Sequence, residues 1–267
     1  MRRSVSFAED LKVRTITIVL FLPLFLVFVL ASRITMVGIF LAVAFLAFWE
    51  YLVVSFGKRE FFPLVLGVGV LTWMYIAPWI AERIWLFGWY VCALLLLGWA
   101  IQDVAKCLER ASFFLFGVFY CFVLPFFWVQ TGLKFSSKLL LFFALLVWIN
   151  DILAYVFGIR WGCHKVLPAV SPGKSWEGFL GGVGGAVLGS LFLGWLFRFP
   201  LGWSCLCGCS IPPFAFFGDV FESALKRRVG LKDSGSLLPG HGGVLDRFDG
   251  FFVVGPLVYF LASLGRG

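Results

Sequence analysis

The sequence is built from apolar runs long enough to cross a lipid bilayer, and this limits the chain to a helical membrane fold. A membrane-spanning helix needs about 20 predominantly apolar residues. Nine runs meet this requirement, with approximate ranges 15–31, 34–54, 61–81, 84–101, 112–130, 138–158, 178–197, 201–222 and 250–264. The fourth and ninth runs are the weakest, so eight or ten helices remain open. We therefore predict an all-α, polytopic integral membrane helical bundle.

The composition favours one membrane domain over several soluble domains. Hydrophobic residues make up 61% of the 267 residues and charged residues 13%, and no polar stretch is long enough to fold separately. We therefore expect a single domain over 1–267. Its N-terminal part, 1–137, would hold membrane helices, and 138–267 would hold the functional helices and cytoplasmic loops.

The distribution of basic residues predicts how the chain is oriented. With the N-terminus in the cytoplasm, 16 of the 22 Lys and Arg residues fall on the cytoplasmic side of the nine predicted helices. Cytoplasmic loops of membrane proteins carry such an excess. The stretch 223–249 would then face the cytoplasm, where nucleotides are available. The net charge of +8 fits anionic lipid headgroups or phosphate-bearing substrates, and no nucleic-acid-reading module is visible.

A first group of polar residues follows the run at 138–158. Asp151 and Tyr155 are four residues apart, so they share one face of a helix. The segment SPGKS, Ser171–Ser175, is predicted to form a tight turn that carries one lysine and two hydroxyls. Its last serine also fits the N-cap of the next helix, with Glu177 in the first turn. Capping and phosphate binding by this segment are compatible.

Two features within the apolar runs are interpreted as structural. The run at 178–197 contains glycines at 181, 182, 184, 185 and 189. Because no GKS or GKT sequence follows them, close helix–helix packing explains these glycines better than a phosphate-binding loop. Glu50, near the end of the run at 34–54, is expected at the membrane interface rather than in a site.

The second polar group begins at the end of the run at 201–222. Asp219, Ser223 and Lys226 are spaced by four and three residues, so they lie on one face if the helix continues. A Gly-rich turn further along the chain contains His241, for which we expect phosphate contact or turn stabilisation. These residues belong to the most strongly charged stretch of the chain.

Three carboxylates in this second group favour a metal site over a solvated basic loop. Asp246 and Asp249 are three residues apart, close enough to share a cation, and Asp219 lies at the membrane boundary. Hard oxygen ligands without thiolate partners indicate Mg²⁺, which is usually held by one or two carboxylates together with substrate phosphates. A second cation remains open. The chemistry indicated is phosphoryl or nucleotidyl transfer.

The residues from Ser223 to Asp249 resemble a known family signature. They read S-x-L-K-R-x4-K-D-x-G-x2-L-P-G-H-G-G-V-x-D-R-F-D, which is similar to the signature of the phosphatidate cytidylyltransferase (CDP-diacylglycerol synthase) family. Similar blocks lie upstream, at 151–155, 158–165 and 171–178. Two departures are visible. The family's usual D-T-G-A-Y reads D-I-L-A-Y at 151–155, and SPGKS stands where SPKKT is common.

This resemblance implies the reaction CTP + phosphatidic acid → CDP-diacylglycerol + pyrophosphate, in the inner (cytoplasmic) membrane. The implied partners are CTP, phosphatidic acid and membrane lipids, with a possible homodimer and no nucleic acid. The implied catalytic residues are Asp219, Asp246, Asp249, Lys226 and Arg247, of which the three aspartates would bind Mg²⁺. The implied substrate-binding residues are Asp151, Tyr155, Lys165, Ser171, Lys174, Ser223, Arg227, Lys232, Asp233, His241 and Gly242.

Three other functions are compatible with parts of this pattern. A CTP-dependent polyprenol or lipid kinase could share the same site architecture. An anionic-lipid transporter would also need charge within the membrane, but the two halves show no inverted repeat. A CDP-alcohol phosphotransferase shares only the superficial D-R-F-D-G run at 246–250, and no further paired aspartates follow it.

Overall fold

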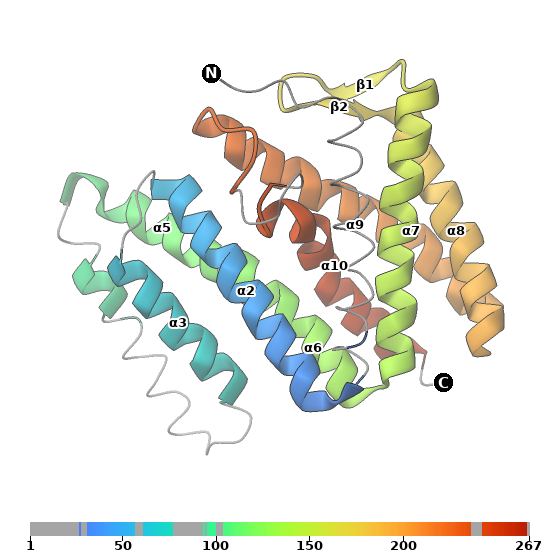
Figure 1. The fold of residues 1–267 in the computed structure, drawn as a ribbon, viewed down its shortest axis with the longest axis horizontal. Coiled ribbons are helices and arrows are strands. Elements are labelled where there is room, and N and C mark those ends of the chain that lie inside the picture. The colour runs from blue at the N-terminus through green and yellow to red at the C-terminus, as the bar shows by residue number, and fades with distance from the viewer. Residues whose placement is uncertain are drawn as a thin grey trace.

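The structure, a computed structural model, is a bundle of long apolar helices (Figure 1). It describes residues 27, 31–56, 61–76, 93, 95–99, 104–235 and 242–265. In these ranges six helices are long and apolar enough to cross a membrane: Arg33–Phe56, Cys107–Lys134, Ser137–Trp161, Trp176–Phe197, Leu201–Arg228 and Leu245–Leu264. The chain is therefore a multi-pass helical membrane protein. The predicted total of nine helices and the orientation of the N-terminus stay predictions.

The described helices match most of the predicted runs. They are α2 (Arg33–Phe56), α3 (Phe61–Ile76), α5 (Cys107–Val118), α6 (Leu124–Lys134), α7 (Ser137–Trp161), α8 (Trp176–Phe197), α9 (Leu201–Arg228) and α10 (Leu245–Leu264). Short segments η2 (Val104–Lys106) and η3 (Phe119–Val123) flank α5. The predicted runs at 15–31 and 84–101 lie largely outside the described residues.

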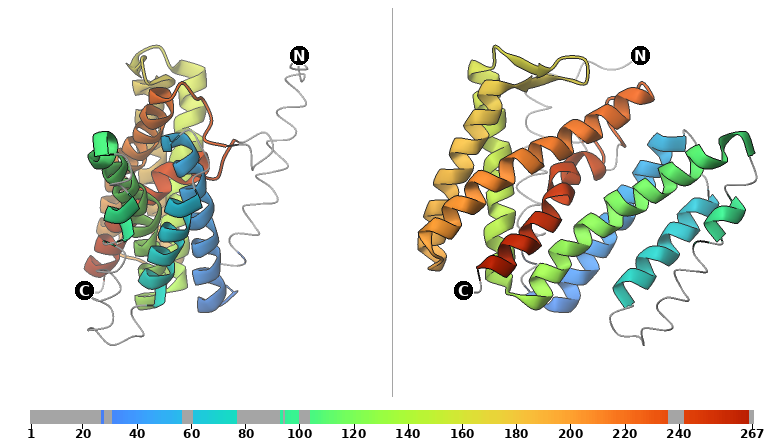
Figure 2. Two further views of the ribbon diagram at one scale, coloured as in Figure 1. Left: turned by 90° about the vertical axis from the view of Figure 1, so that its left-hand side faces the viewer. Right: turned by 180° about the vertical axis from the view of Figure 1, so that it is seen from behind.

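The helices pack in a fixed order around α9 and α10. Helix α7 lies beside α8, α8 beside α9, and α9 beside α10, which in turn packs on α6. Helix α2 completes the bundle between α3 and α6 (Figures 1 and 2). The order brings the two helices with the predicted aspartates into the middle of the molecule.

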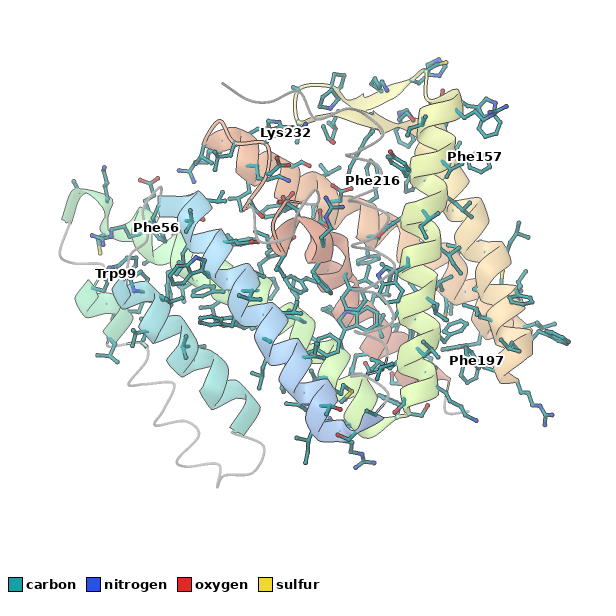
Figure 3. All side chains as sticks on the ribbon, viewed as in Figure 1. Phe56, Trp99, Phe157, Phe197, Phe216 and Lys232 are labelled. Atoms are coloured by element: carbon teal, nitrogen blue, oxygen red, sulfur yellow. The ribbon has the colours of Figure 1, made fainter. Side chains whose placement is uncertain are left out.

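Aromatic side chains fill the interior between these helices (Figure 3). Trp128 and Phe251 stack with ring centroids 3.9 Å apart, and Trp128 Nε1 donates a 2.8 Å hydrogen bond to the backbone oxygen of Phe251. Phe56 and Trp99 form an edge-on pair at 5.6 Å. Aromatic pairs of this kind add attraction beyond the burial of their area, and the buried indole N–H has its partner.

The predicted use of the glycine run in α8 is confirmed. A Cβ at Gly182 would lie 2.7 Å from Asn150 Oδ1 and 3.0 Å from Ala154 Cβ on α7. At Gly185 it would collide with the side chain of Leu153, again on α7. Small residues therefore let α7 and α8 approach closely, as in other membrane helix pairs.

A matched pair of substitutions tests this packing. Gly182→Val is expected to destabilise the protein by about 1–3 kcal/mol, since overpacking forces α7 and α8 apart. Gly184→Val is the control, because nothing lies within 4 Å of a Cβ at Gly184. Both variants place the same β-branched residue in the same helix. Thermal unfolding in detergent measures the difference, and equal melting temperatures for the two variants would contradict the packing argument.

A two-stranded antiparallel hairpin, which the sequence analysis did not predict, joins α7 to α8. Its strands are β1 (Lys165–Leu167) and β2 (Ser171–Ser175), so SPGKS forms a strand and the turn precedes it. The turn closes where Val170 N–H donates to the Leu167 oxygen at 3.1 Å, and Pro168 takes the position that favours its fixed φ. The predicted cap is confirmed, because Ser175 Oγ accepts a 3.2 Å hydrogen bond from Gly178 N–H.

Both helices that carry the predicted aspartates extend beyond their apolar runs. Helix α9 continues to Arg228 rather than ending near 222, and α10 begins at Leu245 rather than at 250. Alanine, leucine, lysine and arginine are strong helix formers, so the sequence ALKRR continues the helix although it is polar. Asp219, Ser223 and Lys226 therefore share one helix, as predicted, and Asp246 and Asp249 lie in the first turns of another.

Candidate active site

Helices α9 and α10 cross at two glycines. A Cβ at Gly218 would lie 2.7 Å from the backbone oxygen of Asp249 and 2.8 Å from Gly250 Cα. A Cβ at Gly250 would lie 2.9 Å from the backbone oxygen of Ala215. The two backbones can approach this closely only because neither glycine has a side chain. The crossing therefore brings Asp219, the neighbour of Gly218, to the helix turn that carries Asp249.

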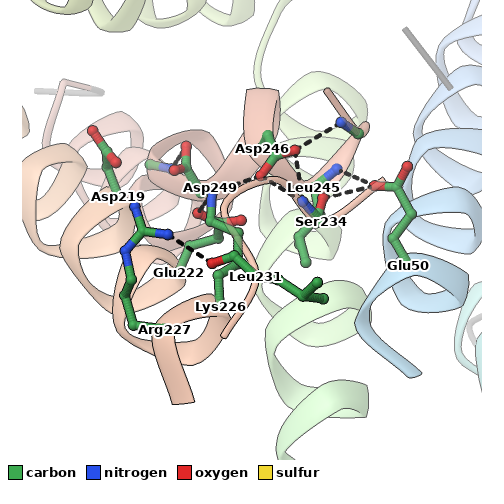
Figure 4. Close-up of polar contacts among 12 residues, drawn as sticks. Glu50, Asp219, Glu222, Lys226, Arg227, Leu231, Ser234, Leu245, Asp246 and Asp249 are labelled. Carbon is green, nitrogen blue, oxygen red and sulfur yellow. Dashed lines mark hydrogen bonds and ion pairs between the residues drawn. The ribbon is translucent and has the colours of Figure 1, made fainter. Parts of the chain in front are cut away.

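Carboxylates gather around this crossing (Figure 4). Asp249 interacts electrostatically with Asp219 and Glu222, which carry the same charge, and with the cation of Lys174. Asp151, on α7, also interacts electrostatically with Asp219 and Lys174. Like charges held together near hydrocarbon are costly, so such a cluster is a candidate site for cations.

The hairpin supplies one cation to the cluster. Lys174 Nζ, on β2, lies 2.6 Å from Asp219 Oδ2 and 4.7 Å from the centre of the Phe216 ring. The side chain of Lys174 is 15% exposed, whereas that of Asp219 is 49% exposed. The lysine is thus covered by the hairpin and α9, while its carboxylate partner remains accessible.

A second lysine joins α9 to α10 in the interior. Lys226 Nζ lies 2.6 Å from Glu222 Oε2 and 2.7 Å from Asp246 Oδ1. The two carboxylate side chains are only 1% and 4% exposed. Charges buried to this extent must be paired, so losing Lys226 would leave both carboxylates uncompensated.

Asp246 also binds the loop that joins α9 to α10, at each of the loop's two described parts, 229–235 and 242–244. Its Oδ1 accepts from Lys226 Nζ and, at 3.1 Å, from Ser234 N–H, and its Oδ2 accepts from Ser234 N–H at 2.9 Å and Gly243 N–H at 2.7 Å. These contacts use the four or so acceptor positions of a carboxylate. Gly242 has φ +81°, and a Cβ there would lie 2.5 Å from Asp246 Oδ2. Glycine is therefore required where the loop reaches Asp246.

Two acidic residues that the sequence analysis did not place in the site take part in it. Glu50 is 3% exposed, so the protein encloses it, and it contacts the loop that carries Asp246 rather than standing apart from these residues. Its position at the membrane interface stays a prediction. Its Oε2 accepts hydrogen bonds from Leu245 N–H at 2.8 Å and Ser234 Oγ at 3.2 Å. The signal for Glu50 was its isolation in an apolar run, and the signal for Glu222 was its position four residues before Lys226.

The other predicted substrate-binding residues are mostly exposed around this cluster. Arg227 donates to the backbone oxygen of Leu231 at 2.6 Å and so closes the C-terminus of α9. Ser223 is buried and Ser171 is half-buried, and the exposed residues are Tyr155, Lys165, Lys232, Asp233 and Arg247. His241 lies outside the described residues.

Asp219 and Asp249, at the α9–α10 crossing, are better placed to bind a divalent cation than Asp246 is. Asp219 is accessible and lies near Asp249, so two helices offer hard oxygen ligands of the kind that Mg²⁺ prefers. Asp246 could bind a cation only by giving up one of its present donors. No three His, Cys, Asp or Glu side chains in the described part of the chain form a preassembled metal site. The metal-ligand roles of Asp219, Asp246 and Asp249 stay predictions.

The fold and the site define a class of protein: a multi-pass membrane protein with paired carboxylates and lysines at one end of its helices. The comparisons identify the family. The family model described as "Cytidylyltransferase family" matches residues 12–264. The chain therefore belongs to the cytidylyltransferase family and is a nucleotidyltransferase, a class of enzyme that generally uses a divalent metal.

Curated relatives match nearly the whole chain. A protein named phosphatidate cytidylyltransferase from Staphylococcus aureus (strain COL) is 33% identical over 258 residues, covering 94% of this chain and 98% of the relative. Proteins of the same name from Staphylococcus saprophyticus and Staphylococcus epidermidis are 32% identical over 265 residues, with the same coverage. The resemblance noted in the sequence thus extends over both halves of the chain.

Proposed function

We propose that the protein transfers the cytidylyl group of CTP to phosphatidic acid, giving CDP-diacylglycerol and pyrophosphate. The observation that carries this proposal is the α9–α10 crossing. It places Asp219 beside Asp249, within electrostatic range of Lys174, and the sequence predicts that Asp219 lies at the membrane boundary. A lipid phosphate and a nucleotide triphosphate both need cationic surroundings, and the lipid must reach them from the bilayer.

In this mechanism, the phosphate oxygen of phosphatidic acid attacks the α-phosphorus of CTP, and pyrophosphate leaves. A phosphomonoester is already largely anionic near neutral pH, so no general base is required. Asp219 and Asp249 would hold a magnesium ion, which offsets negative charge on the reacting phosphates. Asp246 stays a predicted further ligand.

The protein's own cations complete the charge balance. Lys174 lies beside Asp219, and we assign it to the triphosphate. Lys226 keeps α9 and the start of α10 together through Glu222 and Asp246, which preserves the spacing of the carboxylates. Arg227, Lys232 and Arg247 would neutralise CTP or phosphatidic acid.

We infer that the site faces the cytoplasm. Ten described Lys and Arg residues lie toward its end of the bundle, at 106, 110, 160, 165, 174, 226, 227, 228, 232 and 247. Four lie toward the other end, at 33, 134, 138 and 198. The excess follows the positive-inside rule. The bacterial origin of the relatives supports the plasma membrane as the location. The predicted homodimer stays a prediction.

Labelled CTP distinguishes the proposed reaction from its alternatives. Purified protein in detergent is given phosphatidic acid or a polyprenol, with radiolabel at either the α- or the γ-phosphate of CTP. We expect the α-label in CDP-diacylglycerol, formed from phosphatidic acid, and the γ-label only in the released pyrophosphate. Transfer of γ-label to a lipid would establish a kinase instead. If neither label reaches any lipid, the proposed reaction would be contradicted.

A further inference from the structure

Glu50 is the one acidic side chain that α2 buries against the loop between α9 and α10 (Figure 4). It stands in an apolar helix of the N-terminal half, far in sequence from the other charged residues of the site. A carboxylate that is 3% exposed in such a helix requires a specific role, because burying it without partners is costly.

Both ends of the loop close on this single carboxylate. Ser234 Oγ and Leu245 N–H, one from each end, donate to Glu50 Oε2 at 3.2 and 2.8 Å. A Cβ at Gly235 would lie 2.5 Å from Glu50 Oε1, and a Cβ at Gly243 would collide with Oε2. The two glycines thus leave only enough room for the backbone to pass the carboxylate on either side.

The same residues lead directly to the charged cluster. The backbone N–H of Ser234 donates to both oxygens of Asp246, and Gly243 N–H donates to Oδ2. Asp246 in turn pairs with Lys226 at 2.7 Å. A continuous series of contacts therefore connects α2 to the interior lysine of α9.

We propose that Glu50 is a positioning residue for cytidylyl transfer: it clamps the two ends of the loop so that Asp246 and Lys226 keep their places. The catalytic part of this inference rests on the proposed function. Glu50 acts as a hydrogen-bond acceptor, because its described partners are a hydroxyl and two backbone N–H groups rather than a cation. A glutamine, whose amide oxygen also accepts hydrogen bonds, should therefore replace it well.

The test compares Glu50→Ala with Glu50→Gln. Glu50→Ala is expected to lower kcat about tenfold or more and to speed amide hydrogen exchange around Ser234, Gly243 and Leu245 by a similar factor, since two buried hydrogen bonds are lost. Exchange in α7 and α8 should not change. Glu50→Gln should stay within about threefold of the wild type in both measurements. Glu109→Gln is the control, because Glu109, on α5, is exposed and pairs only with the exposed side chain of Arg228 among the ion pairs of the described residues.

The outcomes separate the clamp from other roles. Unchanged exchange around the loop in Glu50→Ala would overturn the proposal, and so would a Gln variant as impaired as the Ala variant, which would indicate a role for the charge. If Glu50→Ala does not fold, Ser234→Ala serves instead. It removes the hydroxyl that donates to Glu50 Oε2, and it must speed amide hydrogen exchange around Leu245. A wild type that makes no CDP-diacylglycerol would refute the proposed function, yet the exchange measurement would still test the clamp.

Discussion

Replacing Asp246 by Asn is expected to reduce CDP-diacylglycerol formation by at least about 100-fold. The carboxylate faces three donors, Lys226 Nζ, Ser234 N–H and Gly243 N–H, and its side chain is only 4% exposed. An asparagine of the same shape has one acceptor oxygen and turns an NH₂ group toward donors that it cannot satisfy. Each buried donor left without its acceptor costs about 1–3 kcal/mol, and where this cost falls on the active conformation, each 1.4 kcal/mol lowers the rate tenfold.

Turnover of purified Asp246→Asn, measured beside its melting temperature, checks this expectation. Part of the loss should appear as lower thermal stability, since the ends of the loop and the pair with Lys226 are released together. Glu109→Gln again serves as the control, because its ion pair with Arg228 is half-exposed and away from the crossing. Near-normal activity of Asp246→Asn would remove Asp246 from the site, both as an organising residue and as a metal ligand.

The second large effect is expected at a residue without a side chain. Gly218→Ala should reduce turnover by about tenfold or more, because its Cβ would lie 2.7 Å from the backbone oxygen of Asp249 and 2.8 Å from Gly250 Cα. Both contacts are with backbone atoms, which cannot rotate away, so α9 and α10 must separate. Overpacking of this kind costs about 1–3 kcal/mol, and here the displacement moves Asp219 away from Asp249.

Gly202→Ala provides the matched control on the same helix, because nothing lies within 4 Å of a Cβ at Gly202. Alanine favours helix more than glycine at both positions, so the local preference alone predicts stabilisation in each case. Steady-state rates over a range of Mg²⁺ concentrations should show a weaker apparent metal affinity for Gly218→Ala alone. Wild-type rates and metal dependence in that variant would mean that the helix crossing does not set the geometry of the site.

The helices were predictable because their signals are local. Apolar runs of sufficient length predicted α2, α7, α8 and the start of α9 nearly to their ends, and the glycine run predicted the contact of α8 with α7. The C-terminal end of α9 and the start of α10 were misplaced because hydropathy alone defined the runs. Helix formers such as Ala224 and Leu225 carry a helix past the apolar boundary.

The residues that the sequence analysis missed depend on contacts between distant segments. Glu50 and Ser234 are 184 positions apart, so no local pattern could connect them. The hairpin was missed because its strands are short and it is fixed by two helix ends, at Trp161 and Trp176, rather than by its own hydrophobic alternation. Asp246 and Asp249 were predicted from a motif and Asp219 from its place after an apolar run, and only the α9–α10 crossing shows how Asp219 and Asp249 come together from different helices.

The most direct test of a metal-dependent cytidylyl transfer site at this crossing is product formation by purified protein. Detergent micelles containing phosphatidic acid are supplied with CTP, with Mg²⁺ present or chelated, while pyrophosphate and CDP-diacylglycerol are followed together. We expect the two products in equal amounts, only when Mg²⁺ is present, and their loss in Asp219→Asn. Product formation that persists under chelation, and in Asp219→Asn, would contradict the assignment of this site.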